Sequence, residues 1–146
     1  LVGSEMCIRD RLSGGLLRRL NIACGIAHKP KLIFLDEPTV AVDPQSRNNI
    51  LDGIKKLRDE GATIVYTTHY MEEVVGADYV YVMEKGKIVM DGTPREIFSK
   101  VDELKAHRLD VPQAKLVADE LQKAGVPIPS GILTREELVD EIMKLA

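Results

Sequence analysis

The chain has 146 residues, of which 45% are hydrophobic and 29% charged, and its formal net charge at pH 7 is −3. This composition is typical of a soluble globular domain. The sequence shows no basic block typical of nucleic-acid binding, no apolar run near the roughly 18 residues that span a bilayer, and no signal peptide. Cys7 and Cys24 are too few for a disulfide framework or a zinc site, so we expect Cys24 in the core and a reducing, cytoplasmic setting.

Residues 12 to 28 are predicted to form a helix, with Ser13 as N-cap and Pro30 preventing its continuation. Apolar residues recur on one expected face of this helix: Leu16, Leu20, Ala23, Cys24 and Ala27. The run from Lys31 to Leu35 follows. Its four consecutive apolar residues are typical of a strand that is buried on both faces of a parallel sheet.

A second helix and a second strand come next. Asp43 before Pro44 predicts a helix start, because aspartate is a good N-cap and proline suits the first helical position, and the helix should end near Gly61. The β-branched run from Thr63 to Thr67 predicts a second parallel strand. Alternation of helix and strand indicates an α/β domain.

The remaining sequence predicts a hairpin followed by short helices. A short helix should begin at Met71, and strands at residues 79–83 and 87–90 should be joined by a tight turn with Gly86 in the left-handed conformation. Farther on, the Thr93–Glu96 and Thr134–Glu137 spacings match the capping box, and further helices are expected at residues 112–123 and from Thr134 onward.

Two adjacent carboxylates, Asp36 and Glu37, directly follow the first predicted strand. The carboxyl ends of parallel strands are where open α/β sheets bind ligands. One carboxylate in such a place can hold Mg²⁺ while the other acts on a water molecule. The alternative is a solvated turn with two acids, which Pro38 and the neighbouring motifs disfavour.

Two further motifs flank this strand. Ser13, Gly14 and Gly15 stand at a predicted helix N-terminus, where free N–H groups attract anions and glycine permits close approach of phosphate, although such a sequence is more often only a cap. A lone histidine after a strand is usually structural, but beside the other motifs we interpret His69 as functional. The other two histidines are expected at the surface: His28 and His107.

In this order, Leu12-Ser13-Gly14-Gly15, Asp36-Glu37 and Thr68-His69 resemble the ATPase subunit of ABC transporters. The resemblance covers residues 12 to about 98. It implies an α/β fold, the C-terminal half of a P-loop NTPase domain, with a small helical C-terminal extension over residues 99–146. It also implies ATP and Mg²⁺ as cofactors.

The resemblance assigns a role to each candidate residue. Asp36 would engage Mg²⁺, Glu37 would polarise the attacking water, and His69 would sense the γ-phosphate. The nucleotide of the opposite subunit would be contacted by the signature loop: Ser13, Gly14 and Gly15. This loop departs from the family at Leu16, where glutamine is usual. Asp43 lies in the place of the D-loop and would reach the subunit interface.

The resemblance is uneven along the chain. Residues 12–70 are most similar to drug-exporter ATPases, and residues 71–146 to the ATPases of energy-coupling factor transporters. The chain is therefore interpreted either as one divergent energy-coupling subunit or as a join of two genes. Residues 1–11 resemble translated adapter sequence, and no fold is expected for them.

The predicted function is that of the ATPase of an ABC transporter, of the energy-coupling factor type. Its partners would be a second ATPase subunit, identical or not, and a transmembrane subunit, with no nucleic acid, at the cytoplasmic face of the membrane. The sequence contains no G-x-x-x-x-G-K-[ST] motif, so we expect the chain alone to be inactive. The alternatives are a drug exporter, a DNA-repair or chromosome ATPase, and a binding module made of the tail alone.

Overall fold

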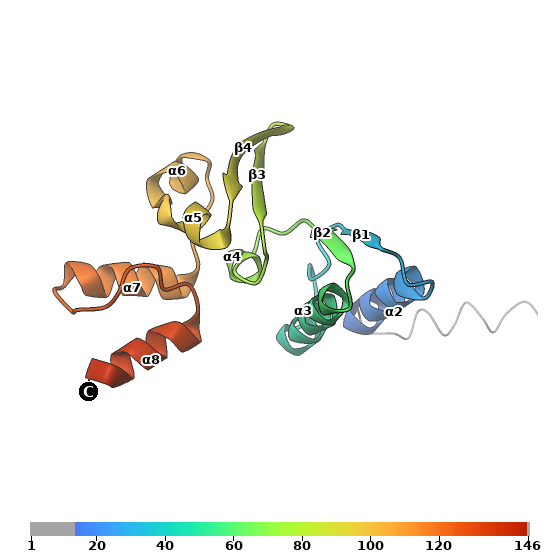
Figure 1. Ribbon diagram of the computed structural model, residues 1–146, viewed down its shortest axis with the longest axis horizontal. Helices are drawn as coiled ribbons and strands as arrows, with labels where there is room; N and C mark the ends of the chain where they lie inside the picture. Colours follow the sequence, from blue (N-terminus) through green and yellow to red (C-terminus); the bar gives the residue numbers. More distant parts are fainter. Residues whose placement is uncertain (1–13, 146) are drawn as a thin grey trace, which may run out of the picture. The chain divides into compact units, whose positions relative to one another are not determined.

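The structure is a computed structural model that describes residues 14–145 (Figure 1). The chain divides into two compact units between His69 and Tyr70. The boundary that sequence analysis placed at residue 98 stays a prediction. Residues on both sides of position 98 share one hydrophobic core, described below.

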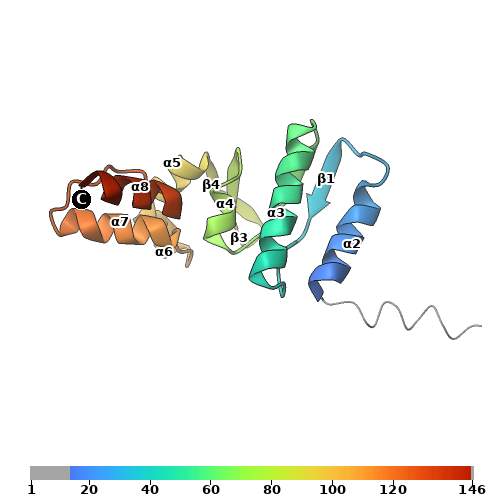
Figure 2. The ribbon, with the colours of Figure 1, turned by 90° about the horizontal axis from the view of Figure 1, so that it is seen from below.

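The N-terminal unit is a strand–helix–strand arrangement preceded by a helix. Its elements are α2 (Gly14–Ile26), β1 (Leu32–Leu35), α3 (Pro44–Asp59) and β2 (Thr63–Tyr66). β1 and β2 pair in parallel, with Leu32 opposite Thr63 and Leu35 opposite Tyr66. In Figures 1 and 2 both helices lie on the same side of this strand pair.

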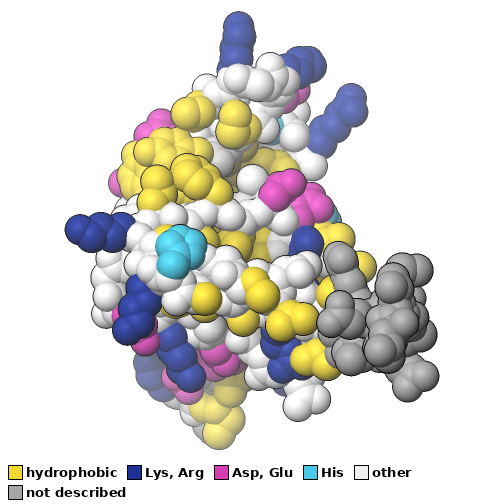
Figure 3. All heavy atoms as spheres, turned by 90° about the vertical axis from the view of Figure 1, so that its right-hand side faces the viewer, with side chains coloured by type: hydrophobic (Ala, Val, Ile, Leu, Met, Phe, Trp, Pro, Cys, Tyr) yellow, Lys and Arg dark blue, Asp and Glu magenta, His cyan; other side chains and the backbone are white. Residues whose placement is uncertain are grey.

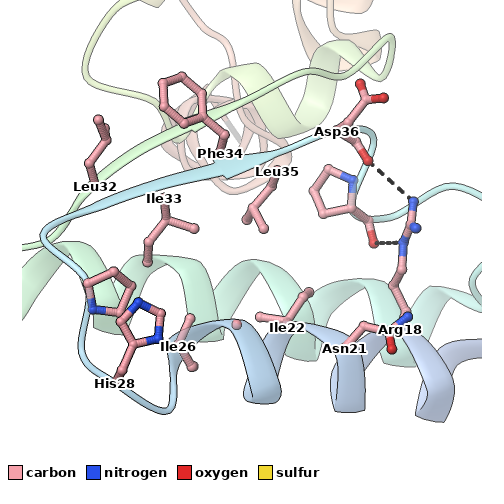
Figure 4. Close-up of a pocket in the computed structure, with 13 residues that line it drawn as sticks. Arg18, Asn21, Ile22, Ile26, His28, Leu32, Ile33, Phe34, Leu35 and Asp36 are labelled. Atoms are coloured by element: carbon pink, nitrogen blue, oxygen red, sulfur yellow. Dashed lines mark hydrogen bonds between the residues drawn. The ribbon is translucent and has the colours of Figure 1, made fainter.

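Only one face of the strand pair is covered. Ile33 is buried and faces α2, whereas Leu32 and Phe34 point to the other side of β1 (Figure 4). Phe34 is 72% exposed, and Val65 of β2 is also exposed. Hydrophobic side chains accordingly gather in the upper part of the surface view in Figure 3. The prediction of a strand buried on both faces is therefore wrong within the described part of the chain.

The buried face of α2 also differs from the predicted one. Leu16, Leu20 and Cys24 are exposed, so the expectation that Cys24 lies in the core is wrong. The inward positions are spaced three or four residues apart along the helix: Gly15, Arg18, Ile22 and Ile26. The apolar stripe predicted from the sequence faces away from β1 and α3. The packing of α2 against these elements sets the orientation of the helix, and local periodicity cannot predict that packing.

The C-terminal unit begins with α4 (Met71–Val74) and an antiparallel hairpin of β3 (Val80–Glu84) and β4 (Lys87–Gly92). Lys85 and Gly86 form the predicted tight turn, with φ of +49° and +77°. Positive φ at both positions is characteristic of the type I′ turn, which matches the twist of the two strands.

Four helices complete this unit: α5 (Pro94–Ser99), α6 (Val101–Ala106), α7 (Gln113–Lys123) and α8 (Arg135–Leu145). The capping box at Thr93 is confirmed, because its side chain accepts from the Glu96 N–H while the Glu96 carboxylate accepts from the Thr93 N–H. Thr134 and Glu137 exchange the same two bonds at the start of α8. Both helix starts were predicted from residues three positions apart.

One hydrophobic cluster joins the hairpin to the helices. Its buried members come from both strands and from the segments after them: Val82, Met90, Ile97, Phe98, Leu104, Val111 and Leu133. His107 adds a polar contact, since its Nδ1 lies 2.8 Å from Glu84 Oε2. His107 is half-buried, so the expectation that it is a surface residue is wrong.

A second, smaller cluster lies between α7 and α8. It is formed by Ala118, Ile128, Ile132 and Leu138. Of the predicted apolar stripe on the last helix, Leu138 is buried in this cluster, whereas Ile142 and Leu145 stay exposed. No helix within residues 14–145 is both long enough and apolar enough to cross a membrane.

Candidate functional site

The candidate residues meet at the carboxyl ends of the two parallel strands. Asp36 and Glu37 directly follow β1, and Thr67 and His69 follow β2. Because β1 and β2 are parallel and in register, their ends lie at the same edge. The fold thus brings Glu37 and His69, which are 32 positions apart, into contact.

Thr67 connects the two carboxylate-bearing residues. Its Oγ1 donates a hydrogen bond to Asp36 Oδ1 at 2.6 Å and accepts one from the Glu37 N–H at 3.0 Å. The hydroxyl group therefore fixes the Asp36 side chain and the Glu37 backbone at the same time. Sequence analysis treated Thr67 only as the end of a strand. Its place beside Asp36 follows from strand register, which a single sequence does not reveal.

Glu37 is held in an uncommon conformation beside a histidine. Its φ is +43°, in the left-handed region that residues with a side chain rarely adopt. Its Oε1 lies 3.1 Å from Nδ1 of His69, and both side chains are about half exposed. A neutral imidazole with its proton on Nδ1 donates a hydrogen bond to the carboxylate in this geometry.

A groove between α2 and β1 adjoins this site (Figure 4). Its walls are apolar where Ile22 and Ile26 of α2 face Ile33 and Leu35 of β1. At one end, the guanidinium of Arg18 reaches the backbone of the Asp36–Pro38 turn. Helical periodicity did not indicate that Arg18, rather than its neighbour Arg19, points inward.

Asp43 is the N-cap of α3, as predicted. Its Oδ1 accepts a hydrogen bond from the Ser46 N–H at 2.9 Å, and this bond lowers the pKa of the Asp43 carboxyl group below its usual value. The hydrogen bond from Ser46 thus stabilises the ionised carboxylate, as expected at the positive end of a helix.

Gly15 packs directly against this cap. A Cβ atom at position 15 would lie 2.7 Å from Ser46 Oγ and 3.3 Å from Asp43 Oδ2, so only glycine fits there. Gly14 is exposed, and Ser13 lies outside the described residues. Gly15 therefore has a packing role that sequence analysis did not predict. This role is additional to the nucleotide contact that the resemblance implies.

Comparisons with known proteins identify the family of the chain. The ABC transporter family matches residues 3–40, and the energy-coupling factor transporter EcfA1 C-terminal domain matches residues 113–146. The energy-coupling factor transporter ATP-binding protein EcfA1 of Caldanaerobacter subterraneus is 52% identical over 134 residues, which is 91% of this chain and 48% of that protein. The chain belongs to the ABC transporter ATPases.

Other relatives of this ATPase segment support the same placement. EcfA1 of Clostridium novyi is 51% identical over 135 residues, and EcfA2 of Lactococcus lactis is 44% identical over 137 residues; each match covers 92% of this chain and 48% of the relative. The chain thus spans about half the length of the curated relatives it matches. Alignments of this length include sequence on both sides of residue 70, so the energy-coupling resemblance is not confined to the C-terminal part.

Solved structures of ABC ATPases share the fold. An ATP-binding cassette of an ABC transporter superimposes with a TM-score of 0.60 and 28% identity, covering 68% of this chain and 40% of that one. The cbiO1 protein of Clostridium perfringens, part of the ABC transporter complex cbiONQ, gives a TM-score of 0.55 and 30% identity, covering 67% and 41%. The predicted α/β fold of a partial ABC ATPase is confirmed.

The donor set at this edge of the ATPase segment suits Mg²⁺ bound with nucleotide. Asp36 is exposed and offers a carboxylate. Within residues 14–145 no group of three or more His, Cys, Asp or Glu side chains could hold a metal ion. Mg²⁺ commonly takes one or two carboxylates and completes its shell with waters and phosphate oxygens, so a single carboxylate fits this ion better than Zn²⁺.

Proposed function

We propose that this chain carries the hydrolytic carboxylate and histidine of an ATPase that powers an energy-coupling factor transporter. The observation that supports it best is the contact between Glu37 and His69, with Thr67 fixing Asp36 beside them. The names of the relatives, along nearly the whole chain, favour this class over drug exporters and over DNA-repair or chromosome ATPases.

In this proposal each residue has a distinct task. The Glu37 carboxylate accepts a hydrogen bond from the attacking water and increases its nucleophilicity. His69, whose Nδ1 lies 3.1 Å from Glu37 Oε1, orients that carboxylate and would sense the γ-phosphate. Asp36 is the residue that would hold Mg²⁺, which neutralises phosphate charge when bound. Phosphoryl transfer depends chiefly on such positioning and charge neutralisation.

The partner subunit would use a different part of the chain. Gly14 and Gly15 stand at the N-terminus of α2, a helix of 13 residues, and the N-terminus of a helix favours negatively charged groups such as phosphate. Together with Ser13 they would contact the nucleotide held by a second ATPase subunit, and Asp43 would lie at the same interface. A transmembrane subunit at the cytoplasmic face of the membrane would complete the transporter.

The decisive experiment measures ATP turnover in an ATPase that carries this segment behind a P-loop half. Glu37→Gln should reduce turnover by roughly 100-fold or more and leave ATP binding intact, because the amide keeps the size of the side chain and loses its charge. His69→Ala should also reduce turnover strongly. Glu60→Gln, on the exposed end of α3, serves as the matched control. Near wild-type turnover in Glu37→Gln would refute the assignment.

The 146-residue chain by itself should not hydrolyse ATP. Its sequence contains no P-loop lysine or glycine-rich cradle to hold the β- and γ-phosphates for in-line attack. Phosphate release from Mg-ATP by the purified chain should match the buffer blank. Turnover that disappears in Glu37→Gln would contradict this expectation.

We also propose that the outer part of α8 contacts a second ATPase subunit. Ile142 is 42% exposed and Met143 70% exposed, although Leu138 on the same helix is buried. Deletion of the tail would be a poor test, because Leu104 and Leu133 belong to the core of the C-terminal unit. Ile142→Glu with Met143→Glu should instead weaken pairing of a full-length subunit in sizing experiments, whereas Ala106→Glu on α6 should not. Unchanged pairing would exclude this contact.

A further inference from the structure

Arg18 binds the backbone of the turn that carries the two acids. Its Nη2 donates to the carbonyl oxygens of Glu37 at 2.5 Å and Asp36 at 3.3 Å, and its Nε donates to that of Pro38 at 3.2 Å. Figure 4 draws the bonds to Asp36 and Pro38. Three consecutive carbonyl groups therefore share one guanidinium group. Arg18 lies on α2, about 20 positions earlier in the chain, so this contact belongs to the tertiary fold.

The turn that Arg18 binds is one that needs support. Glu37 has a φ of +43°, and the left-handed region brings the Cβ atom too close to the backbone carbonyl in L-residues. Such conformations persist only where the surroundings determine them. Thr67 binds the N–H of Glu37 and Arg18 binds its carbonyl oxygen, so the peptide groups on both sides of Glu37 are fixed.

The chemistry of arginine suits this role. Its guanidinium group is planar, always charged and carries five donors in a fixed arrangement, so it can bind several neighbouring carbonyl groups at defined angles. Lysine carries a single point charge on a flexible stem and cannot reproduce that arrangement. Arg19, the next residue of α2, is exposed, whereas Arg18 points toward the turn.

We infer that Arg18 is a positioning residue for hydrolysis: it holds the Asp36–Pro38 turn so that the Glu37 carboxylate is directed to His69 and to the attacking water. This inference rests on the proposed function of Glu37. Misplacement of a reacting group by about 1 Å is enough to cost about 100-fold in rate.

The test separates catalysis from binding in the same P-loop-containing ATPase. Arg18→Ala should lower kcat by roughly 10- to 100-fold, with the KM for ATP changed by no more than about twofold, because the substrate contacts are elsewhere. Arg58→Ala is the matched control, since this guanidinium binds its neighbour Asp59 at the exposed end of α3 and should leave kcat unchanged. A wild-type kcat in Arg18→Ala overturns the inference.

Two more variants guard against misfolding. Arg18→Lys should keep the fold and show a kcat between those of the wild type and Arg18→Ala; a wild-type kcat in Arg18→Lys overturns the role of the guanidinium fork. In the Glu37→Gln background, adding Arg18→Ala should leave ATP affinity unchanged, whereas a merely structural role would weaken it and overturn the inference. Full turnover in Glu37→Gln itself would refute the proposed function. A wild-type kcat in Arg18→Ala, with turnover lost in Glu37→Gln, would refute only the positioning role of Arg18.

Discussion

The two phenylalanines of this chain have opposite environments. Phe34, in the N-terminal unit, is 72% exposed, whereas Phe98, in the C-terminal unit, is 1% exposed. Phe98 sits in a cluster contributed by two strands and several helices. Phe34 projects from a strand pair that has helices on one side only (Figures 1 and 4).

The two environments imply different contributions of the aromatic side chain to the stability of the fold. A buried phenylalanine removes its apolar surface from water and stabilises the fold, whereas an exposed one contributes little to the folding of its own unit. The N-terminal unit carries the residues proposed for hydrolysis, next to a strand pair with one uncovered face. The C-terminal unit carries no proposed hydrolytic residue and has two buried clusters. The proposed catalytic residues therefore lie in one unit, and the two buried hydrophobic clusters lie in the other.

The largest predicted effect on stability is that of Phe98→Ala. Removal of a fully buried aromatic ring should destabilise the C-terminal unit by about 3–5 kcal/mol, because the transfer free energy is lost and a cavity remains. Hydrogen–deuterium exchange of peptides from residues 70–145, read by mass spectrometry, should show strongly increased exchange in this unit.

Phe34→Ala tests the same contrast from the exposed side. Because Phe34 is exposed, its replacement should change stability by no more than about 0.5 kcal/mol. Exchange in peptides from residues 14–69 should therefore stay near that of the parent chain. If Phe34→Ala destabilised the protein as much as Phe98→Ala, the contrast between the two environments would be wrong.

An effect smaller than that of Phe98→Ala is predicted at Gly15, which packs against the start of α3. In Gly15→Ala the new methyl group would lie within 3.0 Å of Ser46, so the N-terminal unit should lose about 1–3 kcal/mol through overpacking. Gly25→Ala is the matched control on the same helix, since nothing lies within 4 Å of its missing Cβ atom. It should be neutral or stabilising by up to about 1 kcal/mol. Urea unfolding that ranked the two variants in the opposite order would refute the close contact.

The smallest predicted effect is a pH dependence in the C-terminal unit. The N–H group of Leu133 and, against the opposing effect of burial, the Arg95 guanidinium lower the pKa of Glu137 below its usual 4.5. A carboxyl group whose pKa is lowered by folding stabilises the folded state above its unfolded pKa and loses that contribution as pH falls through the folded value. Glu137 is partly exposed, so solvent screening keeps the effect small.

The measurement compares melting temperatures at neutral and acidic pH. Glu137→Gln should remove part of the loss of stability that the parent chain shows between about pH 5 and pH 3. The adjacent Glu136→Gln is the control, because Glu136 is exposed on the outer side of α8. Equal acid sensitivity in the parent chain and in Glu137→Gln would show that the bonds from Leu133 and Arg95 do not lower this pKa.

The sequence by itself determined the features that depend on residues close together in the chain. The caps at Asp43, Thr93 and Thr134 and the turn at Lys85 and Gly86 were predictable, because each depends on side chains and backbone groups within a few positions. The signature loop at residues 12–15, the acid pair and the histidine, taken together in this order, indicated the ABC ATPase family.

Tertiary structure alone decided which distant groups meet. Thr67 reaches Asp36 across 31 positions, and Arg18 reaches Pro38 across 20. Local periodicity favoured the Leu16 side of α2 as its buried face, but the helix is oriented by β1 and α3, and Gly15 faces inward instead. The physical reason is that helix periodicity fixes only relative directions along one element. Which direction points inward depends on the packing of other elements, and a single sequence does not record it.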